Sequence, residues 1–327
     1  MRALVTGATG KVGHAVASAL LERGDEVRAL VRDPRRAASA VPSGSELARG
    51  DVTDPASLRD AAEGCELVFN AMGLPEQWLA DNGVFERVNA RGSEAVVRAA
   101  AEAGARRVIH TSTIDVFHAE ASGPLDESGV ADYPKGTAYE RSKQRAEDLV
   151  LAAAGESGIE LVIVNPAAVY GRGPSGSASF ERQLFEPVVN GSRIRAPALP
   201  PGGCGVVFTR GVGRGQLLAA ERGQPGERYI LCDRHVSIRE LVETVVRVAG
   251  RGRVPPTLPV PVARSLAGAG EGLSRLIRRP PLLSSGQLHF FLWNAVPDGG
   301  KAVRELGWRP TPLAEGLRET LTGMGLV

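Results

Sequence analysis

Short apolar runs alternate along the chain with longer segments in which apolar residues recur every three or four positions. The short runs are rich in Val, Ile and Leu and have the length of buried strands. Six strands are expected, at 2–6, 26–31, a short stretch before Gly50, 66–69, 107–110 and 159–164. The clearest helical segments between them are 14–23, 89–103 and 137–154. Strands that alternate with helices predict a parallel, doubly wound sheet with right-handed crossovers.

The pattern changes after Gly171. Residues 172–205 are rich in Gly, Pro and Ser around one helical piece, 180–190. A loop-rich stretch of this length usually has a function, so we expect it to cover a substrate. Further short strands are predicted at 206–209 and 228–231, and further helices at 237–249, 262–278 and 313–321. The expected fold class is α/β: a Rossmann-type doubly wound domain of residues 1–171, with strands contributed by 206–233, and a smaller C-terminal α+β substrate lobe formed by 172–205 and 234–327.

Composition and charge exclude several classes of protein. At 327 residues the chain exceeds the size at which one hydrophobic core usually stops growing, which agrees with two lobes. The net charge of +2, without a long basic run, argues against nucleic-acid binding. The three cysteines are widely spaced and suggest neither a metal site nor a disulfide framework. Without a signal peptide or an apolar run of roughly 20 residues, the chain is expected in the cytoplasm, with no membrane partner.

A glycine-rich turn follows the first predicted strand. Gly7-Ala-Thr-Gly10-Lys-Val-Gly13 lies between that strand and a helical segment, which is the context in which such a loop binds a dinucleotide. Gly7 and Gly10 let the backbone approach a pyrophosphate closely, and the helix N-terminus supplies free N–H groups. Gly13 allows the helix to pack tightly on the strand. Because glycines also mark ordinary turns, the prediction depends on the flanking strand and helix.

The end of the second predicted strand bears on the choice of cofactor. In a doubly wound fold it faces the adenosine ribose, where an acid holds the 2′-hydroxyl of NAD and an arginine accommodates the 2′-phosphate of NADP. Arg32 follows the strand directly and Asp33 comes one place later, so NADP(H) is expected to be preferred over NAD(H). An exposed Arg/Asp turn is the alternative interpretation. Asp51 is expected either to accept a hydrogen bond from adenine or to act as an N-cap or turn residue.

Tyr139 and Lys143 lie four residues apart in a predicted helix and therefore share one of its faces. A phenol has a pKa of roughly 10, and a close ammonium lowers it by favouring the phenolate. This pair can donate a proton to a carbonyl that is being reduced, or accept one from an alcohol that is being oxidised. The hydroxyls of Thr111-Ser112-Thr113 end the fifth strand and could donate to the same oxygen. The alternatives are a solvent-facing pair on an ordinary helix and a capped strand end.

Several motifs in one order resemble the extended short-chain dehydrogenase/reductase superfamily. The similarity is to its NAD(P)-dependent epimerase/dehydratase group, and within that group to dihydroflavonol-4-reductase-like and hydroxysteroid-dehydrogenase-like members. The motifs cover nearly the whole chain: Thr6-Gly-Ala-Thr-Gly-Lys-Val-Gly13, Gly50-Asp51-Val52, Thr111-Ser112-Thr113, Tyr139-x-x-x-Lys143, Asn165-Pro166-Ala-Ala-Val169-Tyr170-Gly171, 221–231 and 301–310. The resemblance implies a dinucleotide-binding domain, a substrate lobe and an NAD(P)-dependent enzyme.

The resemblance also implies roles for individual residues. It assigns Tyr139 as the catalytic acid/base, Lys143 as the group that binds the nicotinamide ribose and lowers the pKa of Tyr139, and Thr113 as the hydroxyl on the reacting oxygen. Cofactor contacts are implied, besides Tyr139 and Lys143, for Gly7, Thr9, Gly10, Lys11, Val12, Arg32, Asp51, Val52, Ala71, Met72, Gly73, Asn89, Thr111, Asn165, Pro166 and Val169. Substrate contacts are implied for Asp115, His118 and Tyr170. Members commonly form homodimers through the two helices predicted at 89–103 and 137–154.

Departures from the family pattern affect the substrate more than the catalytic centre. Arg210-Gly211 stands where members often have Asp-Asp, Phe117-His118 where sugar-modifying members carry Tyr-Gly, and Arg172 where proline is common. We therefore expect an oxidoreductase that reduces a ketone, or oxidises the matching secondary alcohol, on a small and fairly apolar molecule. Two alternatives stay open: a sugar-nucleotide epimerase or dehydratase that recycles bound NAD(H), and a non-catalytic NADP(H) sensor.

Overall fold

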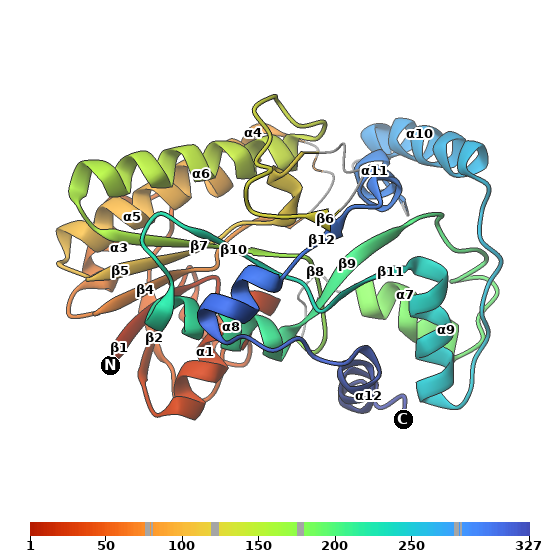
Figure 1. Cartoon of the computed structure of the whole chain (residues 1–327), viewed down its shortest axis with the longest axis horizontal. Coiled ribbons are helices and arrows are strands. Elements are labelled where there is room, and N and C mark those ends of the chain that lie inside the picture. Colours follow the sequence, from red (N-terminus) through yellow and green to blue (C-terminus); the bar gives the residue numbers. More distant parts are fainter. Residues whose placement is uncertain (76–78, 80, 119–123, 175–179, 278–280, 282) are drawn as a thin grey trace.

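A parallel sheet forms the core of the larger part of the molecule, in the left half of Figure 1. The computed structural model describes all residues except 76–78, 80, 119–123, 175–179, 278–280 and 282. Among the described residues, seven strands pair in parallel in the order β10-β7-β5-β4-β1-β2-β3. Their bounds are β1 Arg2–Thr6, β2 Glu26–Val31, β3 Glu46–Arg49, β4 Leu67–Asn70, β5 Arg107–Thr111, β7 Glu160–Pro166 and β10 Arg228–Leu231. This confirms the predicted doubly wound α/β fold class.

Helices cover both faces of this sheet (Figure 1). On one face α1 packs against α8, and on the other α3, α5 and α6 pack side by side. Each face buries its own apolar cluster, with Val16, Leu20 and Val164 in one and Val97, Val150 and Ile163 in the other. The bounds of these and the shorter helices are α1 Lys11–Arg23, α2 Pro34–Ala37, α3 Pro55–Ala62, α4 Gly83–Phe85, a π-helical segment Glu86–Arg91, α5 Gly92–Glu102, a 3₁₀ turn Ile114–Val116, α6 Ala138–Ser157 and α8 Thr209–Arg222.

A smaller lobe is built around a second sheet of order β11-β9-β8. Its core holds Tyr170, Phe185 and Phe208, enclosed by α7, α9 and α12. Two further helices, α10 and α11, pack on each other beside it. The bounds are β8 Ala168–Tyr170, α7 Phe180–Val189, β9 Gly203–Phe208, β11 Arg234–Ser237, α9 Ile238–Ala249, α10 Val260–Ile277, α11 Ser285–Trp293, a π-helical segment Ala302–Leu306 and α12 Leu313–Gly323, with a two-stranded ladder of β6 Pro124–Leu125 and β12 Val296–Pro297.

The structure contains strands and helices that were not among the predicted elements. The strand predicted at 228–231 pairs in parallel with β7 in the main sheet. The strand predicted at 206–209 is β9 of the second sheet, where it lies between β8 and β11, neither of which was predicted. Helix α11 had no counterpart among the predicted elements, although Ser284 and Gln287 form a reciprocal capping box at its start. Such a pair three residues apart is a recognised helix-start signal. It was hidden because α11 is apolar on most sides, so no 3.6-residue alternation marks it.

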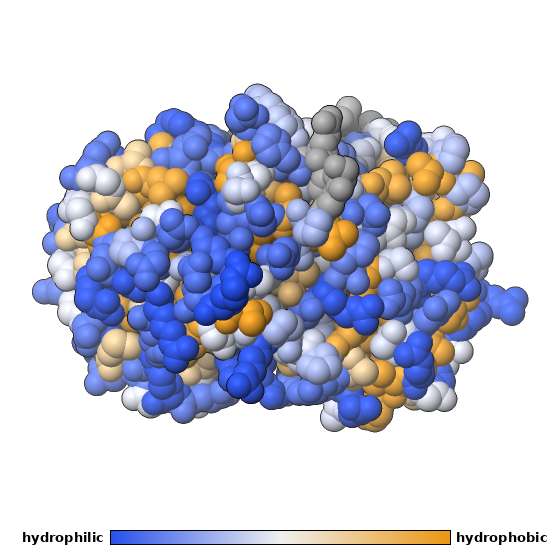
Figure 2. All heavy atoms as spheres, in the orientation of Figure 1, coloured by the Kyte–Doolittle hydropathy of each residue, from blue (hydrophilic) through white to orange (hydrophobic). Residues whose placement is uncertain are grey.

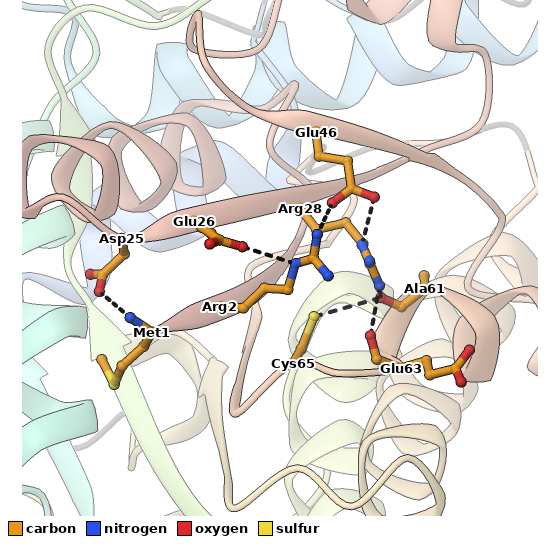
Figure 3. A network of polar contacts seen from close by, with 9 residues as sticks. All are labelled: Met1, Arg2, Asp25, Glu26, Arg28, Glu46, Ala61, Glu63 and Cys65. Carbon is orange, nitrogen blue, oxygen red and sulfur yellow. Dashed lines mark hydrogen bonds and ion pairs between the residues drawn. The ribbon is translucent and has the colours of Figure 1, made fainter.

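The polar network in Figure 3 lies at the amino end of the main sheet. Glu46 of β3 accepts hydrogen bonds from Arg2 at 2.9 Å and from Arg28 at 3.0 Å, so one carboxylate joins β1, β2 and β3. Arg28 also donates to the carbonyls of Ala61 and Glu63 at the end of α3. In parallel sheets ligands bind at the carboxyl ends of the strands. The amino-end network is therefore structural and lies opposite the candidate site.

Helix α10 has an unusual distribution of side chains. It buries Ala263 and Ala267 against α11, while Val262, Leu266 and Leu273 are exposed. Figure 2 shows apolar surface over this part of the smaller lobe. Among the described residues, no helix combines the length and apolar composition needed to cross a bilayer.

Candidate functional site

The glycine turn after β1 has the shape of a dinucleotide cradle. Gly7 has φ +71°, and a Cβ there would lie 2.6 Å from the carbonyl oxygen of Ala71, at the end of β4. A Cβ on Gly13 would lie 2.3 Å from the carbonyl oxygen of Gly7, so the turn and the first turn of α1 are in direct backbone contact. Gly10 is the N-cap of α1 without a side-chain capping bond, and the first turn carries no acid. Uncapped N–H groups and a positive dipole end suit a pyrophosphate, so these residues fit the predicted cofactor.

Lys11 is directed toward the smaller lobe. Its ammonium donates to Glu181 of α7 at 2.6 Å and to the carbonyl oxygen of Val169 at 3.3 Å. Glu181, which is almost fully buried, also accepts from the N–H of Gly171 at 2.8 Å. The Lys11 side chain therefore links the glycine turn to α7, while its contact with the cofactor stays a prediction. Its neighbours in the turn are more open: Thr9 is exposed and Val12 is half-buried.

The adenosine end of the cradle places Arg32 and Asp33 in different situations. Arg32 is exposed at the end of β2, and its positive charge helps to lower the pKa of Asp51, after the hydrogen bond from the backbone of Thr53. Asp33 caps α2 by accepting from the N–H groups of residues 35 and 36 at 3.0 and 3.3 Å. Asp51 accepts from the N–H and hydroxyl of Thr53, so it has the turn role that was one of its two predicted roles. Val52 is buried.

The end of β4 is held by side chains from three elements. Thr6 donates to Asn70 at 2.8 Å and accepts from the N–H of Met72 at 3.2 Å, which fixes the backbone of residues 71–73 beside the glycine turn. Asn89 lies in the π-helical segment before α5, and its amide pairs with the backbone of Leu74 and donates to Ser142 of α6 at 3.1 Å. Short π-helical segments often occur at functional sites. Asn89 thus ties the β4 loop to the helix that carries Tyr139.

Helix α6 brings the predicted catalytic pair to the carboxyl end of the sheet. It begins after Thr137, which forms a capping box with Glu140. Tyr139 is half-buried, and its ring lies edge-on to Phe85, with 6.2 Å between ring centroids. Lys143 is buried one turn further, and its ammonium donates to the carbonyl oxygen of Thr111 at 2.8 Å. An added Cβ at residue 73 would lie 4.0 Å from this ammonium, so it reaches the ends of both β4 and β5.

Burial lowers the pKa of Lys143 to about 8, against the raising effect of Glu147 and Asp115. The ammonium is therefore still mostly protonated near neutral pH. Behind it, Glu147 accepts from Asn165 at 2.9 Å and from Arg228 at 2.7 Å. The Asn165 amide also donates to the carbonyl oxygen of Thr113 at 3.0 Å. The side chain of Asn165, predicted to meet the cofactor, thus supports the strand end from within, and Pro166 ends β7 beside it.

The strand end at residues 111–113 is buried and internally bonded. The hydroxyl of Thr111 accepts from Gln216 of α8 at 2.8 Å, and the N–H of Ser112 donates to Val164 at 2.8 Å. Thr113 caps the 3₁₀ turn, its hydroxyl accepting from the N–H of Asp115 at 3.3 Å. Asp115 is 4% exposed, and burial followed by repulsion from Glu140 raises the pKa of its carboxyl to about 7. This carboxyl therefore titrates in the physiological range.

The other two predicted substrate residues lie in unlike surroundings. His118 is half-buried, its N–H donates to Gly129, and its ring is tilted against Tyr133 at 5.5 Å between centroids. Tyr170 is fully buried in the core of the smaller lobe, and a Cβ on Gly316 of α12 would lie 2.3 Å from its hydroxyl. Tyr170 is thus placed in a packed core instead of at an open surface. Within the predicted pocket segments 73–86 and 172–205, residues 76–78, 80 and 175–179 lie outside the described residues.

Residues that had no predicted role in the site line the contact between α6 and the smaller lobe. Lys135 is buried, donates to the carbonyl oxygen of Phe117 at 2.6 Å and lies 4.4 Å from the ring centroid of Trp293. His289 lies 3.8 Å from Glu140. Trp293 and His289 of α11 thus lie against the loop before α6 and the N-terminal end of that helix. The Ser284–Gln287 capping box was the signal that could have located α11 in the sequence.

Known proteins are similar to this chain over most of its length. A model of the "NAD dependent epimerase/dehydratase family" matches residues 3–197. "Sterol demethylase protein B" of Methylococcus capsulatus is 32% identical over 316 residues, covering 95% of this chain and 94% of that protein. "4-Hydroxy-2-methyl-3-oxo-4-farnesyl-3,4-dihydroquinoline-1-oxide ketoreductase" of Stigmatella aurantiaca is 31% identical over 325 residues, covering 94% and 92%.

The fold recurs in solved structures. The UDP-glucose 4-epimerase of Thermotoga maritima, solved with UDP-glucose, superposes with a TM-score of 0.80 over 99% of each chain at 20% identity, which shows the shared fold alone. The family match and the named relatives confirm the predicted membership and show an NAD(P)-dependent enzyme of the extended short-chain dehydrogenase/reductase type. The chain belongs to the NAD-dependent epimerase/dehydratase family.

Proposed function

We propose that this enzyme is an NADP(H)-preferring oxidoreductase that reduces a ketone, or oxidises the matching secondary alcohol, on a fairly apolar molecule. The observation that carries the proposal is the buried ammonium of Lys143, bonded to the end of β5 and one helical turn from Tyr139. A lysine in that place holds a positive charge where a phenolate has to be stabilised. The family match and this pair would serve an epimerase equally well, so the choice of an apolar ketone rests on the named relatives and on the smaller lobe.

The residues of this chain would bind the cofactor, orient the substrate and transfer the proton. Gly7, Gly10 and the N-terminus of α1 would hold the pyrophosphate, and Lys143, with donors beyond its bond to Thr111, would hold the nicotinamide ribose. When bound, the nicotinamide supplies or accepts the hydride. Tyr139 would donate its phenolic proton to the substrate oxygen in reduction and take it back in oxidation. The Thr113 hydroxyl would hold the same oxygen in place.

The surroundings of Arg32 and Asp33 support NADP(H) over NAD(H). The carboxylate of Asp33 is engaged in capping α2, while the exposed guanidinium of Arg32 is directed to the same region as Asp51. Arginine pairs well with phosphate oxygens, so it suits a 2′-phosphate. Isothermal titration with NADPH and NADH should show tighter binding of NADPH, and Arg32→Ala should remove the difference. Arg318→Ala, an exposed arginine on α12, is the control; tighter NADH binding by the unaltered protein would contradict the preference.

An apolar substrate is supported by the relatives and by the smaller lobe. One relative's name refers to a sterol and the other's to a farnesylated quinoline oxide with a 3-oxo group. Helix α11 carries half-buried Phe290 and Phe291, which pack against the apolar core of the smaller lobe, and its Trp293 lies beside the loop before α6. Apolar walls with a few polar groups are usual for binding sites of such molecules.

The test is the change in nicotinamide absorbance with a panel of steroidal, alkyl and aryl ketones and their alcohols. We expect NADPH-dependent turnover of at least one apolar ketone, with Tyr139→Phe retaining NADPH binding and losing turnover. Cofactor binding without turnover of any panel member would count against the proposal. Purified protein that carries bound NAD and interconverts sugar nucleotides without net cofactor change would instead establish the epimerase alternative.

A homodimer through the π-helical segment, α5 and α6 belongs to the same proposal. These helices pack on each other and cover one face of the sheet. Light scattering should give twice the mass of the 34.3 kDa chain. A monomer mass at micromolar concentration would remove the dimer and leave the catalytic proposal intact.

A further inference from the structure

A buried carboxyl lies against the candidate catalytic hydroxyl, and the reaction just described does not use it. Asp115 is two residues after Thr113 and 4% exposed. Its Oδ1 has no hydrogen-bond partner among the residues that the structure describes. The Thr113 hydroxyl accepts the N–H of Asp115 at 3.3 Å, and its side-chain hydrogen bond to the Asp115 carboxyl lowers the pKa of that carboxyl, against the larger effect of burial. A buried polar atom without a partner calls for an explanation.

The contact matters because the Thr113 hydroxyl can donate only one hydrogen bond. A hydroxyl has one proton to donate and two lone pairs that accept. One lone pair takes the N–H of Asp115. When the carboxyl is ionised it can only accept, so it draws the hydroxyl proton to itself and away from a substrate. When the carboxyl is neutral it can donate to the second lone pair, and the hydroxyl proton is then directed outward.

We propose that Asp115 is a positioning residue, whose neutral carboxyl turns the Thr113 hydroxyl into a hydrogen-bond donor for the reacting oxygen of the substrate. This inference rests on the proposed carbonyl chemistry of Tyr139 and deepens it. No bond is made or broken at Asp115 during the reaction. When the carboxyl is ionised, the substrate oxygen receives a hydrogen bond from Tyr139 but none from Thr113.

The charged groups around Asp115 come from several elements and oppose one another. Glu140 of α6 repels its negative charge, while Lys135 of the preceding loop and Lys143 of α6 attract it. On the smaller lobe, the thiol of Cys204 in β9 is close enough for Asp115 to raise its pKa, after burial. His289 of α11 approaches through Glu140, at 3.8 Å. Burial is the largest influence, so the neutral form persists to about pH 7.

Two variants change this balance without removing the framework. Asp115→Asn keeps an N–H donor for Thr113 and removes the titration. Glu140→Gln keeps the acceptor that the capping box needs, since glutamine also serves there, and removes the repelling charge. The first should abolish the pH dependence that Asp115 causes, and the second should move it to lower pH, because an ionised Asp115 is then less disfavoured.

The coupling can be measured without any substrate. Difference infrared spectroscopy in D₂O should show a protonated-carboxyl band that is lost on raising the pH through about 7 and is absent from Asp115→Asn. Glu140→Gln should lower the midpoint, and Thr113→Val should shift both band and midpoint. A carboxyl already ionised near pH 5.5, or a band that Thr113→Val leaves unchanged, would overturn the inference.

The kinetic experiment measures NADPH oxidation with progesterone and with 2-decanone as ketone probes. Between about pH 6 and pH 7.5, the rate of Asp115→Asn relative to the unaltered enzyme should rise about fourfold, the factor by which a carboxyl of pKa near 7 loses its neutral form. A merely structural role would give the same ratio at every pH and would refute the positioning. Absence of turnover with both probes would speak against the proposed function, and the infrared result would then decide the coupling alone.

Discussion

Replacing Asp115 by asparagine should change stability in a manner that depends on pH. Burial raises the pKa of this carboxyl from 3.8 to about 7 in the folded protein. Between these values the folded state holds a proton that the unfolded state has released, so the contribution to stability is complete below about pH 4 and is lost as the pH rises through about 7. The asparagine does not titrate and escapes this loss.

The magnitude follows from the two pKa values. One unit of pKa corresponds to about 1.4 kcal/mol, and the loss is spread over the interval between the two values. Between about pH 5 and pH 8 the free energy of unfolding of the unaltered protein should fall by roughly 2.5 kcal/mol more than that of Asp115→Asn. This is the larger part of the loss of about 4 kcal/mol expected over the whole interval between the two pKa values. Few single groups produce so large a change, because most carboxyls are exposed.

Urea unfolding followed by tryptophan fluorescence and circular dichroism, at both pH values, measures this difference. Comparing variant with parent at each pH cancels the other titrating groups. Asp148→Asn, an exposed residue on α6, is the matched control and should show no such divergence. If Asp115→Asn and the parent differed by the same free energy at both pH values, the carboxyl would be ionised in the folded protein and the reasoning would be wrong.

Three further predictions test the site. Tyr139→Phe should lower the rate of ketone reduction by about 10²–10⁴-fold, measured by NADPH absorbance, with NADPH affinity unchanged; retained turnover would exclude Tyr139 as the acid. Gly13→Ala would place a Cβ 2.3 Å from a backbone oxygen and should abolish NADPH binding in titration calorimetry. Gly155→Ala is the control: its Cβ would meet no described atom within 4 Å beyond its own helix backbone, so it should be neutral or stabilising by about 0.5–1 kcal/mol. Lys11→Met should destabilise the fold by about 3 kcal/mol, because it removes the cation from buried Glu181. The double variant with Glu181→Gln should recover part of this loss in the same urea assay, whereas additive losses would argue against a coupled pair.

Local sequence determined the main sheet and the cofactor cradle. The strands at 2–6 and 26–31 have the predicted bounds, because buried parallel strands are short apolar runs that local composition reveals. The glycine turn is also recognisable locally, since Gly13 is required by a backbone contact with nearby Gly7, although Gly7 itself lies against Ala71 beyond the adjoining strand β4. Tyr139 and Lys143 share a face because helical periodicity places them there.

Tertiary structure decided what those residues meet. Nothing near Lys11 in the sequence indicates Glu181, 170 positions away, and nothing near Asp115 indicates that Glu140, Lys135 and Cys204 surround it. The apolar helix α11 was likewise invisible to periodicity and is positioned by its contacts with β9 and α10. Local patterns record which face of an element is buried, whereas the pKa of a carboxyl and the partner of an ammonium depend on distant segments that folding brings into contact.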